Sequence, residues 1–141
     1  MAELRRLDHV AIAVRDTDAA LRRFRDELGL EVVSTERLEQ PPVRLTYLDC
    51  GNCYLQLVEP LSADTPVAGF VAKHGDGLHH ICFGVDDVAA TVRALSGLPP
   101  ALGSGRGRLS AFLPGEQPGV RVELTEFRRQ EDVERTLGFI G

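Results

Sequence analysis

Two segments of the chain, residues 7–16 and 78–87, alternate large apolar residues with small or polar ones in the same order. A period of two is typical of a half-buried β-strand. Each segment ends at an aspartate, Asp16 or Asp87, that can cap the helix predicted to follow it. Because strand and helix recur at a constant offset, the sequence predicts an internal repeat.

Both helices are predicted from apolar residues spaced three or four positions apart, and each ends at a glycine, Gly29 or Gly97. A helix with this spacing covers a sheet with one face and meets water with the other. The predicted apolar faces consist of Ala20, Leu21, Phe24 and Leu28 in the first helix and of Val88, Val92 and Leu95 in the second.

Further strands are expected after each helix. Gly51 and Asn52 are predicted to form a two-residue hairpin turn between two of these strands. Glycine and proline are frequent in 98–107, so the strand expected there is hard to place. The predicted strands are 31–35, 43–50 and 53–59 in the first copy and 108–113 and 120–127 in the second.

We therefore predict an α+β fold in which two tandem βαβββ modules form one domain. A short helix at 65–73 is expected in the linker between them, with Pro66 at an early helical position. The C-terminal tail is either a helix that packs on a neighbour or a frayed end. The predicted boundaries are 1–141 for the domain, 5–60 and 78–127 for the modules, 61–77 for the linker and 128–141 for the tail.

Composition narrows the class of protein. The chain has 141 residues, of which 43% are hydrophobic and 26% charged, as in soluble globular domains. A net charge of −5 argues against a nucleic-acid partner. We find no apolar run of the roughly 18 residues that a membrane span needs, and no signal-peptide pattern at the N-terminus. Three cysteines are too few for a disulfide scaffold, so we expect a cytoplasmic protein.

The repeat brings four metal-binding residue types to two equivalent pairs of positions. His9 matches His80 in the first strands, and Gln56 matches Glu123 in the last strands. A single histidine or glutamine in a strand is usually a hydrogen-bonded core or surface residue. Four metal-binding residues at equivalent positions of the repeat instead favour a metal site. Two imidazoles, an amide oxygen and a carboxylate suit a divalent first-row cation, with two octahedral positions left for substrate or water. His79 and His74 are not expected to be ligands.

The sequence resembles the vicinal oxygen chelate superfamily and, within it, the methylmalonyl-CoA epimerases. The resemblance runs from about residue 7 to residue 127, and the run Gly75–Ile81 is fairly specific to the epimerases. The other segments that carry it are 8–14, 28–33, 55–60 and 122–124. It implies a cupped mixed sheet around a metal held by four ligands, which correspond here to His9, Gln56, His80 and Glu123.

The same resemblance implies the cofactor, substrate and reaction. We expect one divalent ion per chain (Co2+, Zn2+, Ni2+ or Mn2+), a 2-substituted acyl-CoA substrate, and epimerisation through a metal-stabilised enolate. A homodimer is also expected. Some epimerases carry a glutamate where Leu45 stands here. The candidate bases are therefore Glu123, which would serve as ligand and base, and Glu39, on the predicted loop with Pro41 and Pro42 that precedes Leu45.

The sequence is also compatible with other functions. A glyoxalase-type lyase of a thiol adduct would use the same four ligands, and an Fe(II) ring-cleaving dioxygenase would leave Gln56 without a role. A drug-binding protein of the bleomycin-resistance type shares the fold and normally lacks the ligands. Cys50 and Cys53 flank the hairpin turn and are more simply a cross-strand pair than a zinc site. Arg106 and Arg108 are weaker candidates for contacts with CoA phosphates.

Overall fold

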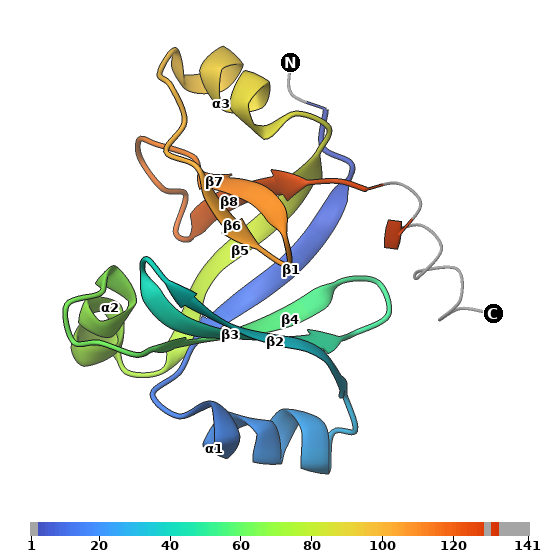
Figure 1. The fold of residues 1–141 in the computed structure, drawn as a ribbon, viewed down its shortest axis with the longest axis vertical. Coiled ribbons are helices and arrows are strands. Elements are labelled where there is room, and N and C mark those ends of the chain that lie inside the picture. Colours follow the sequence, from blue (N-terminus) through green and yellow to red (C-terminus); the bar gives the residue numbers. More distant parts are fainter. Residues whose placement is uncertain (1–2, 129–130, 133–141) are drawn as a thin grey trace. The chain divides into compact units, whose positions relative to one another are not determined.

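The computed structural model describes residues 3–128 and 131–132 of the chain (Figure 1). Its elements follow the order βαβββ twice, with one helix between the copies, so the predicted fold class is confirmed. The predicted tail lies outside the described residues except for Arg128, Glu131 and Asp132. The first copy contains β1 (Arg6–Ala13), α1 (Thr17–Leu21) with its π-helical continuation η1 (Arg22–Glu27), β2 (Glu31–Glu39), β3 (Pro42–Asp49) and β4 (Tyr54–Pro60). The second contains β5 (Gly77–Val85), α3 (Val88–Ser96), β6 (Gly103–Gly105), β7 (Arg108–Phe112) and β8 (Arg121–Glu126), and α2 (Pro66–His74) lies between them.

The eight strands belong to one mixed sheet in the order β2-β3-β4-β1-β5-β8-β7-β6. Strand β5 pairs with β8 in parallel, whereas β2–β3, β3–β4, β6–β7 and β7–β8 are antiparallel. The chain divides into two compact units: Val10–His79, which we call the middle unit, and Met1–His9 with His80–Gly141, which we call the terminal unit. Strands β1 and β5 each contribute residues to both.

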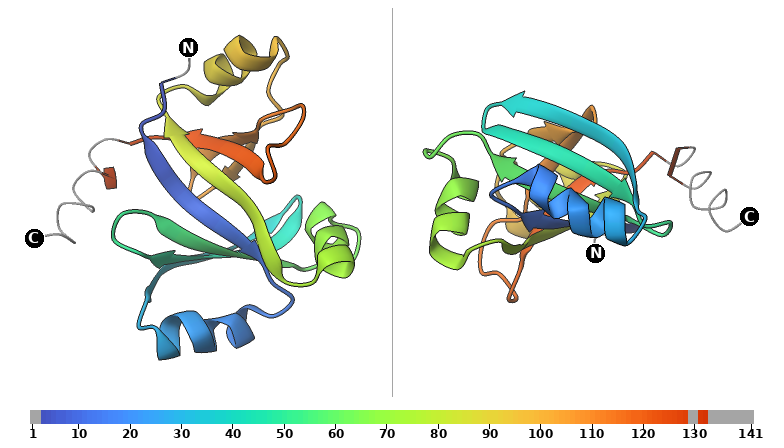
Figure 2. Two further views of the ribbon diagram at one scale, coloured as in Figure 1. Left: turned by 180° about the vertical axis from the view of Figure 1, so that it is seen from behind. Right: turned by 90° about the horizontal axis from the view of Figure 1, so that it is seen from below.

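The middle unit buries both faces of its sheet. On β4, side chains alternate, so Leu55 and Leu57 lie on one face and Gln56 and Val58 on the other. The first face packs under α1, which Figures 1 and 2 show lying along strands β2–β4. The second face packs against α2. The buried sets are Val14, Leu21, Leu48, Leu55 and Leu57 on the α1 side and Ala11, Ala13, Val43, Leu45, Tyr47, Tyr54, Val58, Val67 and Val71 on the other.

The terminal unit has a smaller core beneath α3. Asp87 caps this helix by accepting a hydrogen bond from the Ala90 amide at 2.9 Å, as the sequence predicted. Val88 and Val92 of the helix are buried against the sheet, and each buried valine contributes roughly 1.5–3 kcal/mol. The core consists of Val85, Val88, Val92, Ala111 and Leu124.

Two residues predicted on apolar helix faces are exposed instead. Leu28 is 61% exposed and Leu95 is 52% exposed, and both belong to the last turn of their helices. In the first helix, this turn is π-helical, since the Leu28 amide donates to the Arg23 carbonyl five residues back at 3.0 Å. The wider turn rotates Leu28 away from the face that Leu21 occupies. Leu95 lies just before Gly97, where the left-handed φ of 72° ends α3.

Strand β2 is longer than predicted. It continues to Glu39 because it pairs with β3 as far as Glu39 opposite Pro42, so the proline-containing segment is a tight turn rather than a loop. The strand that glycine and proline obscured is β6, three residues long, paired with β7. Short or proline-containing strand ends carry too little periodicity to place from sequence.

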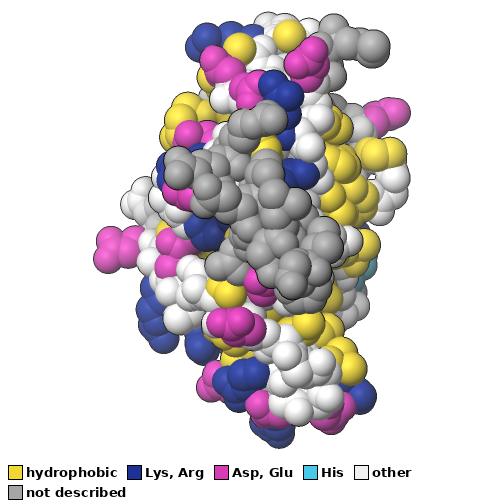
Figure 3. Space-filling model, turned by 90° about the vertical axis from the view of Figure 1, so that its right-hand side faces the viewer, with side chains coloured by type: hydrophobic (Ala, Val, Ile, Leu, Met, Phe, Trp, Pro, Cys, Tyr) yellow, Lys and Arg dark blue, Asp and Glu magenta, His cyan; other side chains and the backbone are white. Residues whose placement is uncertain are grey.

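Within the described residues, no helix is long and apolar enough to cross a membrane. On the face drawn in Figure 3, acidic and basic side chains are interspersed, with hydrophobic side chains among them. This mixture agrees with the small net charge of −5.

Candidate metal centre

Three predicted ligands meet in the terminal unit. The His9 Nε2 atom lies 3.2 Å from the His80 Nε2 atom and 3.2 Å from the Glu123 Oε1 atom, and His80 Nε2 lies 3.3 Å from the same oxygen. Donor atoms about 2.1 Å from one ion are ~3.0 Å apart at a right angle and ~3.4 Å apart at a tetrahedral angle. The three separations fall within this range, so the donor set fits a single divalent cation.

The strand register explains why these side chains converge. Strands β5 and β8 run in parallel with His80 opposite Arg121 and Cys82 opposite Glu123. Paired residues and residues two apart share a face, so His80, Cys82 and Glu123 project from the same side of the sheet. The apolar residues on the other side, such as Leu124, fill the core under α3. Phe112 on β7 packs edge-on against the His80 ring, with ring centroids 5.0 Å apart.

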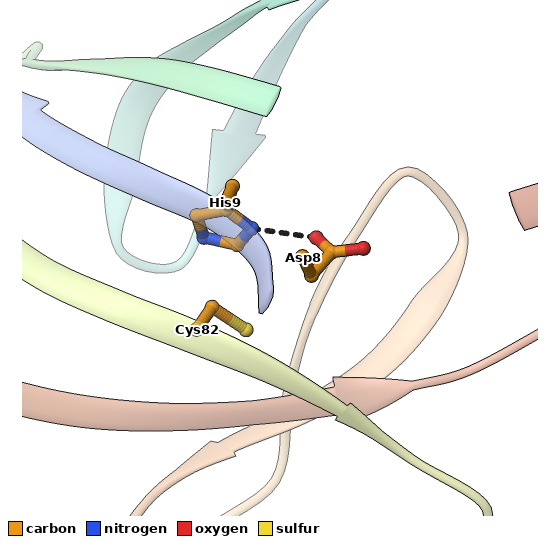
Figure 4. Close-up of side chains that lie close together, drawn as sticks. All are labelled: Asp8, His9 and Cys82. Carbon is orange, nitrogen blue, oxygen red and sulfur yellow. Dashed lines mark hydrogen bonds and ion pairs between the residues drawn. The ribbon is translucent and has the colours of Figure 1, made fainter. Parts of the chain in front are cut away.

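His9 is held from its other side by Asp8. Its Nδ1 atom lies 2.7 Å from the Asp8 Oδ2 atom, and both side chains are buried. Figure 4 shows the two residues facing each other on β1, with Cys82 on the neighbouring β5. Arg106, from the turn between β6 and β7, contacts the same Asp8 oxygen. Because Nδ1 is engaged with Asp8, Nε2 is the nitrogen that His9 presents to His80 and Glu123.

Electrostatics favour a cation at this place. Burial alone raises the pKa of Glu123, but hydrogen bonds and charges from His80 and His9 outweigh burial and bring that pKa well below its usual value. Burial likewise opposes ionisation of Asp8, and hydrogen bonds and charges from His9 and Arg106 lower its pKa below the ordinary value. Burial lowers the pKa of His80. Burial alone lowers the pKa of His9, but hydrogen bonds and charges from Asp8 and Glu123 outweigh burial and raise that pKa. Two carboxylates held ionised in a buried place therefore favour positive charge there.

The predicted fourth ligand, Gln56, lies in the middle unit. Its side chain is buried, and its Nε2 atom donates a hydrogen bond to the Tyr47 hydroxyl at 2.7 Å. The amide oxygen, Oε1, accepts no hydrogen bond from the described residues. A buried polar oxygen without a partner is costly, so it suits a position where a cation is the missing partner.

A second group of donors shares His9 with the first. Donor atoms of Asp8, His9 and Cys82 lie within 4.8 Å of one another (Figure 4). Here, however, the His9 and Asp8 donor atoms are hydrogen-bonded to each other. The guanidinium of Arg106 already supplies a positive charge next to Asp8. Burial raises the pKa of the Cys82 thiol well above its ordinary value, which keeps it in the protonated form that metals bind poorly. The group of His9, His80 and Glu123 is therefore the better cation site.

The other predicted residues have different surroundings. Glu39 is exposed at the end of β2, in the middle unit and outside both donor groups. Leu45 is buried in the core of the middle unit. Cys50 and Cys53 are thiols beside the β3–β4 turn and belong to neither group found among the described residues.

The remaining histidines and arginines are engaged elsewhere. His79 and His74 both pack against the Phe70 ring, with centroids 5.0 Å and 4.9 Å away. Arg106 contacts Asp8, and Arg108 forms a buried ion pair with Asp132 at 2.9 Å, so both guanidinium groups bind carboxylates of this chain.

Sequence reasoning missed three side-chain contacts with the predicted ligands and their partners, made by Asp8, Tyr47 and Arg106. Asp8 immediately precedes a predicted ligand, and a carboxylate there is a recognisable signal for a histidine partner. Tyr47 faces Gln56 across the β3–β4 pair, but this register is visible only in the structure. Arg106 is far from Asp8 in sequence, and no periodic pattern links them.

Comparison with known proteins identifies relatives. Residues 8–98 match the Glyoxalase/Bleomycin resistance protein/Dioxygenase superfamily. The chain is 38% identical over 130 residues to an ethylmalonyl-CoA/methylmalonyl-CoA epimerase of Cereibacter sphaeroides, covering 86% of this chain and 97% of that protein. It is 36% identical over 134 residues to the mitochondrial methylmalonyl-CoA epimerase of Mus musculus, covering 88% and 74%. A structure described as methylmalonyl-CoA epimerase in complex with methylmalonyl-CoA and NH4+ superposes with a TM-score of 0.76 at 37% identity, covering 88% of this chain and 95% of that one.

Proposed function

This chain belongs to the Glyoxalase/Bleomycin resistance protein/Dioxygenase superfamily, and we propose that within it the chain is a metal-dependent epimerase of methylmalonyl-CoA or a close analogue. The resemblance to the vicinal oxygen chelate superfamily and its epimerases is confirmed by relatives that cover most of the chain. Their names give the substrate class, a thioester of CoA with a carboxylated, substituted α-carbon.

The observation that carries the proposal is the convergence of His9 Nε2, His80 Nε2 and Glu123 Oε1 within about 3.3 Å of one another. We assign these three residues and Gln56 as ligands of one divalent ion. The unsatisfied amide oxygen of Gln56 and the lowered pKa of Glu123 support this assignment. Binding proteins of the bleomycin-resistance type normally lack these ligands, so the set favours an enzyme.

When bound, a divalent ion supplies Lewis-acid assistance, which lowers the cost of removing a proton next to a thioester carbonyl. We assign Glu123 the further task of taking the α-proton. Glu123 contacts both imidazoles through Oε1, so we assign this oxygen to the metal. In our proposal, the other carboxylate oxygen takes the proton. The C–H electron pair then passes to the carbonyl system, and return of a proton to the opposite face inverts the α-carbon.

Glu39 is the second candidate for proton transfer. It is exposed at the β2–β3 turn, where a carboxylate can exchange protons with water. Leu45, which stands where some epimerases carry a glutamate, is buried among apolar side chains and has no ionisable group. An epimerase needs a proton donor or acceptor on each face of the α-carbon, so Glu123 and Glu39 divide the two roles in our proposal.

The test is loss of the α-proton signal of methylmalonyl-CoA in D2O, followed by proton NMR with Co2+-loaded protein. We expect rapid exchange in the wild type and a decrease of at least 100-fold in Glu123→Gln, with unchanged fold by circular dichroism. Glu39→Gln is the matched variant, and wild-type epimerisation in it would remove Glu39 from the scheme. Absence of exchange with methylmalonyl-CoA and ethylmalonyl-CoA, together with turnover of a glutathione hemithioacetal, would replace the epimerase by a lyase.

We further propose a homodimer in the cytoplasm. Thiols rather than disulfides at Cys50, Cys53 and Cys82 agree with a reducing compartment. Sedimentation equilibrium measures the mass directly, and a species of 15.4 kDa at micromolar concentration would contradict the dimer.

A further inference from the structure

The turn between β6 and β7 has an unusual residue in a left-handed conformation. Arg106 has φ 55° and Gly107 has φ 69°, the pattern of a tight hairpin turn. For a residue with a Cβ atom, this conformation costs roughly 1–2 kcal/mol, so glycine or asparagine is usual there. Among the described residues outside glycine, Arg106 is the one with positive φ. Backbone strain of this kind is found mostly at functional sites, where the side chain has a specific contact to make.

The Arg106 side chain is directed inward to Asp8. Its Nη2 atom contacts Asp8 Oδ2, and the exposed fractions of the two side chains are 11% and 1%. The same Asp8 oxygen lies 2.7 Å from His9 Nδ1, so the three groups form a continuous chain from the turn to the candidate metal centre. The guanidinium donates to Asp8 in a charge-assisted hydrogen bond and so holds the carboxylate in place against His9 Nδ1.

Stability alone does not explain this arrangement. The other Asp8 oxygen, Oδ1, is buried and accepts no hydrogen bond from the described residues. A half-satisfied buried carboxylate costs free energy that an apolar side chain would not. Two locally unfavourable features, a strained arginine and an incompletely paired aspartate, therefore lie next to one ligand. Such features gather where function requires them.

We propose that Arg106 and Asp8 are positioning residues for His9, fixing the ring proton on Nδ1 so that Nε2 is presented as an unprotonated donor to the cation. This inference rests on the proposed metal site. A ligand histidine whose second nitrogen is held by a carboxylate keeps one tautomer and one ring orientation, and loss of such a partner lowers metal affinity 10- to 100-fold. Asp8 acts directly on His9, and Arg106 acts through Asp8.

Substitution of Asp8 by asparagine separates positioning from packing. Asp8→Asn keeps the shape of the side chain, but its amide can donate to Nδ1, which would move the ring proton to Nε2 and block the donor. Arg106→Gly removes the guanidinium and relieves the left-handed strain, so the turn itself should not be weakened. Arg106→Lys keeps the charge without the planar fork. Arg5→Lys is the control, because Arg5 pairs with Asp86 in the same unit.

Two measurements test the proposal. Titration with Co2+ by calorimetry should show a 10- to 100-fold weaker Kd in Asp8→Asn and Arg106→Gly, a smaller loss in Arg106→Lys, and no change in Arg5→Lys. Nitrogen-15 NMR of the neutral His9 ring in the metal-free protein should show the proton on Nδ1 in the wild type and on Nε2 in Asp8→Asn.

An unchanged His9 tautomer and wild-type affinity in Asp8→Asn and Arg106→Gly would overturn the positioning role. If the wild-type protein bound no Co2+, the proposed function would fail instead. The ring measurement needs no metal, so it would still decide whether Asp8 and Arg106 fix the tautomer.

Discussion

Replacing Tyr47 by phenylalanine removes one oxygen atom and tests how Gln56 is held. The Tyr47 ring is 2% exposed and packs edge-on against Tyr54 at 6.2 Å between centroids, and phenylalanine keeps this packing. The lost hydroxyl accepts the 2.7 Å hydrogen bond from Gln56 Nε2. Its removal leaves a buried amide donor without this partner and lets the Gln56 amide rotate.

The magnitude follows from these contacts. A buried donor that loses its partner costs about 1–3 kcal/mol, because its desolvation is no longer offset. For a domain of this size, each 1 kcal/mol lowers Tm by roughly 2–4 °C, so the metal-free variant should melt about 2–12 °C lower. Without the hydroxyl, the Gln56 amide is less well oriented toward the metal, and we expect at least tenfold weaker Co2+ binding.

The assay combines thermal unfolding of the metal-free protein with Co2+ calorimetry. Tyr54→Phe is the matched control, since it removes a phenolic hydroxyl from the same buried cluster. We expect Co2+ affinity to remain at the wild-type level in that variant. Wild-type Co2+ affinity in Tyr47→Phe, with or without a change in Tm, would refute the assignment of Gln56 as a ligand that Tyr47 orients.

Two stability predictions follow from other contacts. Arg108→Met leaves the Asp132 carboxylate buried at 1% exposure without its 2.9 Å partner, which should cost about 3–5 kcal/mol in urea unfolding, and Arg108→Met with Asp132→Leu should recover much of the loss. If Arg108→Met alone were as stable as the wild type, the ion pair would contribute nothing to stability. Leu57→Ala removes a fully buried side chain from the α1 side of the middle unit and should cost about 2–5 kcal/mol, whereas a loss below 1 kcal/mol would contradict the packing described.

Much of the fold follows from periodicity in the sequence. The alternation in β1 and β5 and the caps at Asp16 and Asp87 are local signals, and the structure contains both. Strand ends and helix ends were less predictable. The π-helical turn that exposes Leu28 arises from hydrogen bonds between residues five apart, and a pattern based on 3.6 residues per turn does not describe it.

The sequence predicted the ligands of the candidate site but not the contacts that orient them. The repeat relates His9 to His80 and Gln56 to Glu123, so sequence alone could group the four residues. The structure brings the donor atoms of His9, His80 and Glu123 together. The contacts that orient them are not related by the repeat. Arg106 reaches Asp8 across 98 positions of the chain, and only the folded structure joins residues so far apart.

Titration of the metal-free protein with Co2+, followed by visible and near-ultraviolet absorption, tests the central claim most directly. We predict saturation at one ion per chain, with absorption typical of nitrogen and oxygen ligands and no thiolate-to-cobalt charge-transfer band. Loss of binding is expected in His80→Ala and retention in Cys82→Ala. A strong charge-transfer band that disappears in Cys82→Ala, with His80→Ala still binding, would place the ion at Asp8, His9 and Cys82 and contradict the site at His9, His80 and Glu123.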